Sequence, residues 1–371
     1  MRWKEQLLTL TPYQPGKTIG EVKRQYGLTE ITKLASNENP FGCSKRVKEV
    51  LKNEVAFEKY PDGYAAEFRY QLADFLHVNP NQLIFGNGSD EIIQIISRAL
   101  LDGRYNTVMA APTFPQYKHN AIIDGAPIKE IPLINGEHDL SNMLEAIDEK
   151  TNVVWLCSPN NPTGTYIPED KLLAFLNKVP KETLVVLDEA YYEYVDAEDY
   201  YNSIDLIDTF ENLIVLRTFS KIYGLASFRI GYGVSNPDII RLLEPAREPF
   251  NTNTLGQLVA AEAIKDQEFV SFCKEANREG LQQFYHFCED NGLKYYPSQA
   301  NFILIDFNRQ GNEVFQYLLE KGFIVRSGNA LGFPTSVRIT VGSKEQNEGL
   351  IKLLDEYLVS VNAQQKNTVS K

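Results

Sequence analysis

Short apolar runs alternate with helical patterns between about residues 80 and 235. The runs are nearly continuous in apolar, often β-branched residues, which is typical of strands buried on both faces of a mostly parallel sheet. We predict strands at 83–85, 107–110, 153–157, 184–187, 213–216 and 230–234, with helices between them, for example at 90–101 and 169–176. The alternation of strands and helices predicts α/β architecture.

The pattern changes beyond about residue 255. A long helical stretch, interrupted near Asp266, precedes shorter strand patterns, which predicts a smaller α+β domain. The expected elements are helices over 255–291, 311–321 and 344–358 and strands at 301–306, 323–326 and 337–341. We therefore expect an N-terminal segment (1–30) that packs with the small domain, a large domain (31–254), a small domain (255–361) and a disordered polar tail (362–371).

Composition and charge restrict the class of protein. The 371 residues are enough for about two domains, and the net charge of −12 without a basic stripe argues against nucleic-acid binding. No apolar stretch is long enough to span a membrane, and the polar start of the chain predicts no signal peptide. The four cysteines lack CxxC spacing and are expected to be reduced thiols in the cytoplasm. The four histidines show no ligand spacing, which argues against a metal enzyme.

Candidate chemistry follows the strands, because ligands of open α/β sheets bind outside the carboxyl ends of the strands. Lys221 lies after a buried strand in the run Thr-Phe-Ser-Lys-Ile-Tyr-Gly-Leu-Ala-Ser-Phe-Arg. Its position suits an amine that condenses with an aldehyde, while Thr218, Ser220 and Arg229 suit a phosphate. Pyridoxal phosphate (PLP) needs both partners at once and is the expected cofactor. The alternative is that Lys221 and Arg229 are solvated surface cations.

The strand at 83–85 is followed by Gly-Asn-Gly-Ser-Asp-Glu and then a helix. Gly88 allows close backbone approach and Ser89 is a good N-cap, so free N–H groups there suit a phosphate. The alternative is a simple capped turn. Because the pattern is not G-x-G-x-x-G, a dinucleotide site has little support.

Two further strand ends carry polar groups. Asn161 lies in a Ser-Pro-Asn-Asn-Pro-Thr-Gly turn, where a cis bond to Pro162 would position its amide. Asp188 follows four buried apolar residues and would be desolvated unless paired, and a protonated pyridine nitrogen is a suitable partner. Tyr191 is three residues further on and suits a ring oxygen. The alternatives are an ordinary Asn/Pro/Gly turn and an aspartate that caps a helix.

In this order, each at a strand end, these features resemble the fold-type I PLP-dependent aminotransferases, and the resemblance covers essentially the whole chain. It implies a large domain with a mostly parallel sheet flanked by helices and a smaller α+β domain. Lys221 then corresponds to the Schiff-base lysine and Asp188 to the partner of the pyridine nitrogen, with Tyr191 the third catalytic residue. Asn161 and Tyr191 correspond to the ligands of the phenolic oxygen.

The same resemblance implies a phosphate site and an aromatic stack. The phosphate site consists of the backbone N–H groups of Ser89 and Asp90 and the side chains of Thr218, Ser220 and Arg229. Phe114 corresponds to the aromatic residue that stacks on the cofactor ring, and Tyr117 to a second contact.

Four stretches narrow the resemblance to the histidinol-phosphate aminotransferases: Pro-Tyr-Gln-Pro-Gly-Lys (12–17), Leu-Ala-Ser-Asn-Glu-Asn-Pro (34–40), Lys-Tyr-Pro-Asp-Gly (59–63) and Arg-Glu-Pro-Phe-Asn (247–251). This resemblance implies a homodimer with shared active sites, in which Tyr60 reaches the cofactor phosphate of the neighbouring subunit. Tyr13 and Asn161 would contact substrate. Arg326 and Arg338 would bind its carboxylate and phosphate groups; alternatively they are edge-strand cations.

The implied reaction, part of histidine biosynthesis, interconverts L-histidinol phosphate and 2-oxoglutarate with imidazole acetol phosphate and L-glutamate by a ping-pong PLP mechanism. Three alternatives stay open at this point. They are an aromatic amino acid (Tyr/Phe) aminotransferase, alone or as a second activity, a PLP-dependent lyase or decarboxylase, and a PLP-binding regulator without turnover.

Overall fold

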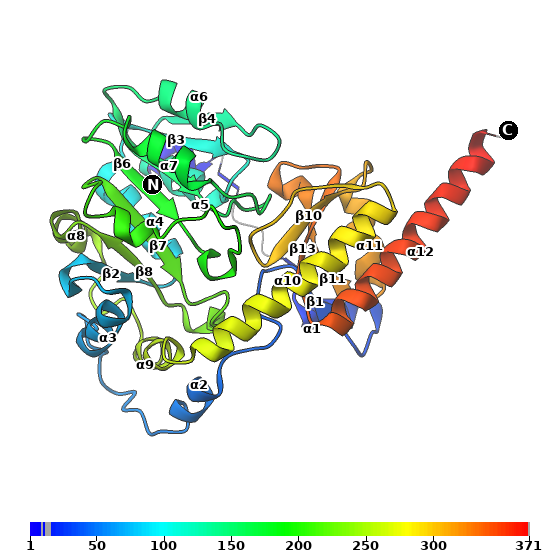
Figure 1. Ribbon diagram of the computed structural model, residues 1–371, viewed down its shortest axis with the longest axis horizontal. Helices are drawn as coiled ribbons and strands as arrows, with labels where there is room; N and C mark the ends of the chain where they lie inside the picture. Colours follow the sequence, from blue (N-terminus) through cyan, green and yellow to red (C-terminus); the bar gives the residue numbers. More distant parts are fainter. Residues whose placement is uncertain (9, 12–15, 370–371) are drawn as a thin grey trace.

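The computed structural model describes residues 1–8, 10–11 and 16–369 (Figure 1). In this part of the chain the central feature is a seven-stranded sheet of order β2-β8-β7-β6-β5-β3-β4, in which only β8 runs antiparallel to its neighbours. The strands are β2 (Leu83–Gly86), β3 (Asn106–Ala111), β4 (Ile128–Pro132), β5 (Thr151–Cys157), β6 (Leu184–Asp188), β7 (Leu213–Thr218) and β8 (Gly231–Ser235). The predicted α/β fold with a mostly parallel sheet is confirmed. Strand β4 was not predicted, because this edge strand lacks a buried apolar run.

Alternate residues of the strands face two separate apolar cores, one on each face of the sheet. Val186 and Ile214 belong to one core and Val185 and Val215 to the other, which explains the continuous apolar runs. Helices α4 (Ser89–Leu100), α5 (Pro115–Asp124) and α8 (Pro237–Leu243) cover the first core. The second is covered by α3 (Ala66–Leu76), α6 (Leu140–Glu145), α7 (Glu169–Leu176) and α9 (Thr254–Ala263).

The smaller domain is built on a four-stranded antiparallel sheet of order β12-β13-β10-β9. Its strands are β9 (Lys294–Tyr295), β10 (Phe302–Asp306), β12 (Arg326–Ser327) and β13 (Ser336–Thr340), and its helices are α11 (Gly311–Glu320) and α12 (Lys344–Val369). Helix α10 (Gln267–Asp290) joins the two domains, since Cys273 belongs to the core of the large domain and Phe284 to that of the small one (Figure 1). β1 (Thr32–Lys33) pairs in parallel with β11 (Phe323–Ile324).

Several short elements complete the described chain. The remaining helices are α1 (Ile19–Tyr26) and α2 (Lys45–Val50), and the 3-10 turns are η1 (Glu5–Leu8), η2 (Pro80–Gln82), η3 (Tyr192–Tyr194), η4 (Ser203–Leu206), η5 (Ala226–Phe228), η6 (Glu244–Ala246) and η7 (Gly328–Leu331).

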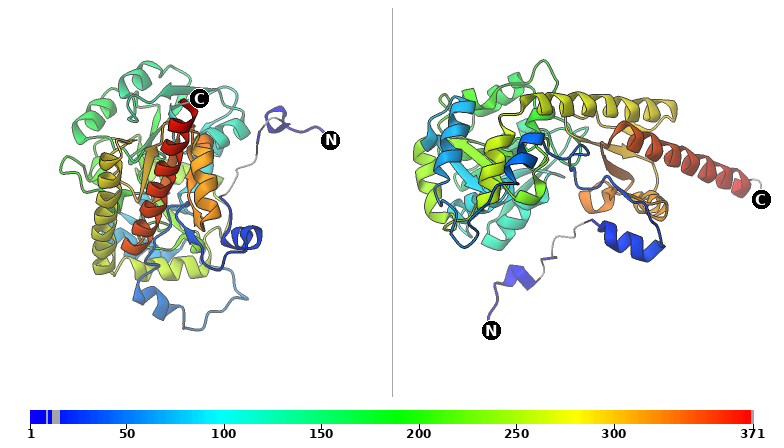
Figure 2. Two further views of the ribbon diagram at one scale, coloured as in Figure 1. Left: turned by 90° about the vertical axis from the view of Figure 1, so that its right-hand side faces the viewer. Right: turned by 90° about the horizontal axis from the view of Figure 1, so that it is seen from below.

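The structure modifies the expected domain boundaries in three places. Helix α9, assigned to the small domain from the sequence, packs on α2 and α3 of the large one. The N-terminal segment divides, because Val22 of α1 contacts the small domain, whereas Lys4 near η1 donates to the carbonyl of Ile123 at 3.0 Å. Helix α12 continues to Val369, so the tail expected to be disordered is helical up to that residue, in a stretch without proline (Figure 2). Residues 370–371 lie outside the described chain.

Candidate active site

A cavity of about 410 Å³ opens at the carboxyl ends of β5, β6 and β7, between the two domains. Most of the residues singled out from the sequence line it: Ser89, Asp90, Phe114, Asn161, Asp188, Tyr191, Thr218, Ser220, Lys221, Arg229, Arg326 and Arg338. The last two come from β12 and β13 of the small sheet, so the cavity needs both domains. Parallel strands direct their carboxyl ends to one edge, which explains why residues far apart in sequence meet here.

Asp188 ends β6 and is 2% exposed, so its carboxylate has lost nearly all its water. Burial raises the pKa of Asp188 to about 6, although a hydrogen bond from Tyr117 opposes the shift. The Tyr117 hydroxyl donates to Oδ2 of Asp188 at 2.7 Å, and the backbone N–H of Ala190 donates to Oδ1 at 3.2 Å. A buried carboxylate with two neutral donors favours a cationic partner in the cavity.

Lys221 follows β7 and points its amine towards the Tyr191 ring, with Nζ 5.7 Å from the ring centroid. Burial, together with the positive charge of Arg338, lowers the pKa of Lys221 to about 8. An amine with a pKa near neutrality is partly unprotonated at physiological pH, and only that form is a nucleophile or a base.

Thr218, Ser220 and Arg229 form a cluster of donors opposite the start of α4. The Thr218 hydroxyl donates to the Ser220 hydroxyl at 3.0 Å, and Nη1 of Arg229 lies 3.4 Å from the same oxygen. Helix α4 begins at Ser89 with Gly88 as its N-cap, so Ser89 is the first helical residue and not the cap expected from the sequence. Gly88 has φ +73°, a conformation that favours glycine, and a Cβ there would lie 2.7 Å from Nη2 of Arg229. Hydroxyls, a guanidinium and a helix N-terminus make this cluster a candidate anion site.

Tyr191 and Asn161 lie side by side, and a third residue joins them. The Tyr191 hydroxyl accepts hydrogen bonds from the amides of Asn37 at 2.9 Å and Asn161 at 3.4 Å, which leaves its proton available to a ligand. Nη1 of Arg338 donates to Oδ1 of Asn161 at 2.7 Å. The peptide bond between Asn161 and Pro162 is cis.

The sequence interpretation missed three contributors to this region. Asn37 lies in one of the stretches used for the family resemblance, but nothing in its spacing indicated contact with Tyr191. Glu189 and Arg217 form a buried ion pair at 3.0 Å next to the last residues of β6 and β7, and the Arg217 guanidinium lies 3.4 Å from the ring centroid of Tyr192. The sequence offered one signal for this pair: Glu189 directly follows Asp188, and Arg217 directly precedes Thr218.

Three residues named from the sequence are not part of the cavity lining as described. Tyr117 is fully buried, with its ring stacked on Trp155 at a centroid distance of 4.9 Å. It contacts Asp188 from behind the cavity wall and does not line the cavity. Tyr60 is 82% exposed and stacks on Phe250. Tyr13 lies outside the described residues. Arg326 and Arg338 both face the cavity, and Arg338 is buried.

None of the helices in the described chain combines the length and the apolar character needed to cross a membrane. A family model described as aminotransferase class I and II matches residues 29–354. The chain is 64% identical to a histidinol-phosphate aminotransferase of Geobacillus sp. (strain WCH70) over 359 residues, 96% of this chain and 98% of that protein. It is 62% identical to a histidinol-phosphate aminotransferase of Bacillus subtilis (strain 168) over 360 residues, 96% of this chain and 100% of that protein.

A solved structure, histidinol-phosphate aminotransferase from Sinorhizobium meliloti in complex with pyridoxal-5'-phosphate, superimposes with a TM-score of 0.88 at 26% identity. The superposition covers 97% of this chain and 98% of the other. The similarity therefore extends over both domains.

Proposed function

The chain belongs to the aminotransferase class I and II family, and on that premise we propose that its cavity is the active site of a PLP-dependent histidinol-phosphate aminotransferase. The enzyme interconverts L-histidinol phosphate and 2-oxoglutarate with imidazole acetol phosphate and L-glutamate, a step of histidine biosynthesis. The proposal rests mainly on one observation: Lys221, Asp188 and the Arg229 cluster line the same cavity. The chain is also similar over nearly its whole length to enzymes of that name.

The residues present fit PLP. The anion site at Ser220, Arg229 and the start of α4 suits the phosphate, and the buried Asp188 carboxylate suits a protonated pyridine nitrogen. Asn161 and Tyr191 are placed to hold the phenolic oxygen. PLP, when bound, supplies an aldehyde for the substrate amine and a ring that accepts electrons from its Cα.

The protein's own groups perform the proton transfers. Lys221, with its lowered pKa, is the group that takes the proton from the substrate Cα and returns it, acting as base and then as acid. The Asp188 carboxylate would pair with the positive charge of a protonated ring nitrogen when PLP is bound. Phe114, which lines the cavity at the start of α5, would pack against the cofactor ring and orient it.

The two arginines of the small domain bind the anionic ends of the substrates. The guanidinium of Arg338 is held by Oδ1 of Asn161 and by the carbonyl oxygen of Ala35 at 2.8 Å, so its orientation is set before a ligand arrives. A fixed planar fork of donors suits a carboxylate or a phosphate. Arg326 and the Tyr13 segment complete the substrate pocket in this proposal.

The enzyme is proposed to be a cytoplasmic homodimer with shared active sites. Phe57, Tyr60 and Phe250 are large aromatic residues with 74%, 82% and 47% exposure, and a second copy would cover them. Tyr60 then contacts the cofactor phosphate of the neighbouring subunit. All four cysteines are free, which supports a reducing compartment. Sedimentation of Tyr60→Ala against the unsubstituted protein tests the dimer.

The function is tested by absorbance of the PLP-loaded protein while histidinol phosphate, and separately phenylalanine, is added without any oxo acid. Conversion of the cofactor to its amine form at low histidinol phosphate alone supports the proposal. Equal conversion by both amines indicates an aromatic aminotransferase activity as well. No conversion by either, in a protein that binds PLP, would refute the proposal in favour of a lyase or decarboxylase, and Lys221→Ala should abolish turnover in every case.

A further inference from the structure

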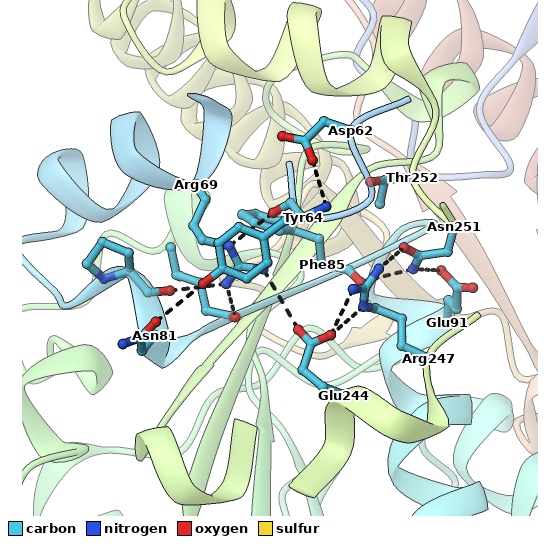
Figure 3. Close-up of polar contacts among 12 residues, drawn as sticks. Asp62, Tyr64, Arg69, Asn81, Phe85, Glu91, Glu244, Arg247, Asn251 and Thr252 are labelled. Carbon is cyan, nitrogen blue, oxygen red and sulfur yellow. Dashed lines mark hydrogen bonds and ion pairs between the residues drawn. The ribbon is translucent and has the colours of Figure 1, made fainter. Parts of the chain in front are cut away.

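Asn251 ends the Arg-Glu-Pro-Phe-Asn stretch and joins three parts of the large domain (Figure 3). Its amide nitrogen donates to Oε2 of Glu91 at 2.7 Å and to the carbonyl oxygen of Phe85 at 3.1 Å. Its amide oxygen accepts from Nη1 of Arg247 at 2.9 Å. The single side chain therefore ties the end of β2, the first turn of α4 and the segment after η6 together.

Asn87 connects this network to the anion site. The Asn87 side chain donates to the backbone carbonyl of Asn251 at 2.8 Å, and its backbone N–H donates to Oε2 of Glu91 at 2.6 Å. The carbonyl oxygen of Asn87 accepts from Nη2 of Arg229 at 3.1 Å. Asn87, whose carbonyl oxygen accepts from the Arg229 guanidinium, is thus itself held by the Glu91 carboxylate and by the backbone carbonyl of Asn251.

The other end of the network is anchored in the protein interior. Arg247 donates through Nε and Nη2 to one oxygen of Glu244, both at 2.8 Å, and the second oxygen of Glu244 lies 3.8 Å from Nη2 of Arg69 (Figure 3). The Arg69 guanidinium is 2% exposed and donates to the backbone carbonyls of Tyr64, Pro80 and Leu83. A buried cation with this many fixed acceptors cannot move without breaking several hydrogen bonds.

We propose that Asn251 is a positioning residue for the cofactor phosphate, acting through Glu91 and Asn87 on the Arg229 guanidinium and the first N–H groups of α4. This rests on the proposed binding of PLP in the cavity. Asn251 itself does not line the cavity, so its effect is exerted only through the geometry of the anion site. Loss of its amide removes three hydrogen bonds, to the Glu91 carboxylate, to the carbonyl oxygen of Phe85 and from Arg247. Asn87 keeps its bond to the backbone carbonyl of residue 251, but the Glu91 carboxylate that holds its N–H loses a donor.

The test compares the dissociation constants of PLP and of pyridoxal, which lacks the phosphate, by absorbance titration of the protein freed of cofactor. Asn251→Ala should weaken PLP binding by about tenfold or more, the loss expected for a hydrogen bond to a charged group, and leave pyridoxal binding within about twofold. Glu91→Ala removes the same connection from the α4 side and should give the same selective loss. Glu91→Gln keeps an acceptor oxygen and should restore most of the affinity.

Asn212→Ala is the matched control, because that amide likewise donates to two acceptors, the backbone carbonyls of Pro180 and Thr183, but these lie outside the anion site. It should leave the ratio of the two constants unchanged. Equal weakening of PLP and pyridoxal binding by Asn251→Ala, or no weakening of either, would overturn the inference. If that variant does not fold, Glu91→Ala decides by the same criterion. Failure of the unsubstituted protein to bind PLP at all would overturn the proposed function first.

Discussion

Replacing Tyr117 by phenylalanine should make Asp188 a stronger base while the shape of the site is kept. The substitution removes one oxygen atom, which donates to Oδ2 of Asp188 at 2.7 Å. The ring remains stacked on Trp155 at an interplanar angle of 11°. The backbone N–H of Ala190 remains as a donor to the other carboxylate oxygen.

The size of the effect follows from the charge of the acceptor. A hydrogen bond to an ionised group contributes about 1.5–3 kcal/mol, and one pKa unit corresponds to about 1.4 kcal/mol. The pKa of Asp188, which burial raises from 3.8 to about 6, should therefore rise by about one to two further units in Tyr117→Phe.

The raised pKa predicts how stability depends on pH. Folded protein without cofactor binds the Asp188 proton more tightly than unfolded protein, so the contribution to stability is present at low pH and is lost as the pH rises from 3.8 to about 6. In Tyr117→Phe the loss continues for another one to two pH units. The free energy of unfolding of the variant should therefore lie below that of the unsubstituted protein at pH 8, by about 1.3–2.3 kcal/mol more than at pH 5.

Urea unfolding of the protein freed of PLP, at pH 5 and pH 8 and at one protein concentration, measures this difference. Tyr285→Phe is the control, because the Tyr285 hydroxyl is hydrogen-bonded to the backbone of Ser298 and its removal should cost the same at both pH values. A destabilisation by Tyr117→Phe that is equal at pH 5 and pH 8 would refute the reasoning.

Three other predictions concern the same cavity. Gly231→Ala should weaken PLP binding at least tenfold in an absorbance titration, because a Cβ there would lie 2.6 Å from the backbone nitrogen of Ser89. An unchanged affinity would show that the backbone around Ser89 can shift without loss of binding. Arg338→Lys should raise the KM for 2-oxoglutarate about 10- to 100-fold, since the guanidinium fork is lost, and an unchanged KM would place the carboxylate elsewhere. The rate of PLP loading, followed by stopped-flow absorbance, should rise with pH and level off above about 8, because only unprotonated Lys221 attacks an aldehyde; a rise that continues to pH 10 would contradict the lowered pKa.

The strands and their polar ends could be predicted from local pattern. Continuous apolar runs identified six of the seven strands of the large sheet, and polar residues directly after them, such as Asp188 and Lys221, meet at one cavity. These properties depend on short stretches of chain, because a strand buried on both faces must be apolar throughout and parallel strands end at a common edge. Edge strand β4 and the end of α12 escaped prediction, since neither carries that pattern.

The amino-acid sequence by itself therefore determined the fold class and the cofactor chemistry, and it predicted most of the polar residues that line the cavity. Only the tertiary structure decided that Tyr117 holds Asp188 rather than lining the cavity, and that Asn37 holds Tyr191. The same is true of Asn251, which reaches the anion site only through Glu91 and Asn87. Each of these contacts joins residues 71 to 164 positions apart. Such a contact cannot be predicted from periodicity or from a motif in the sequence, because it depends on how helices and loops pack against the sheet.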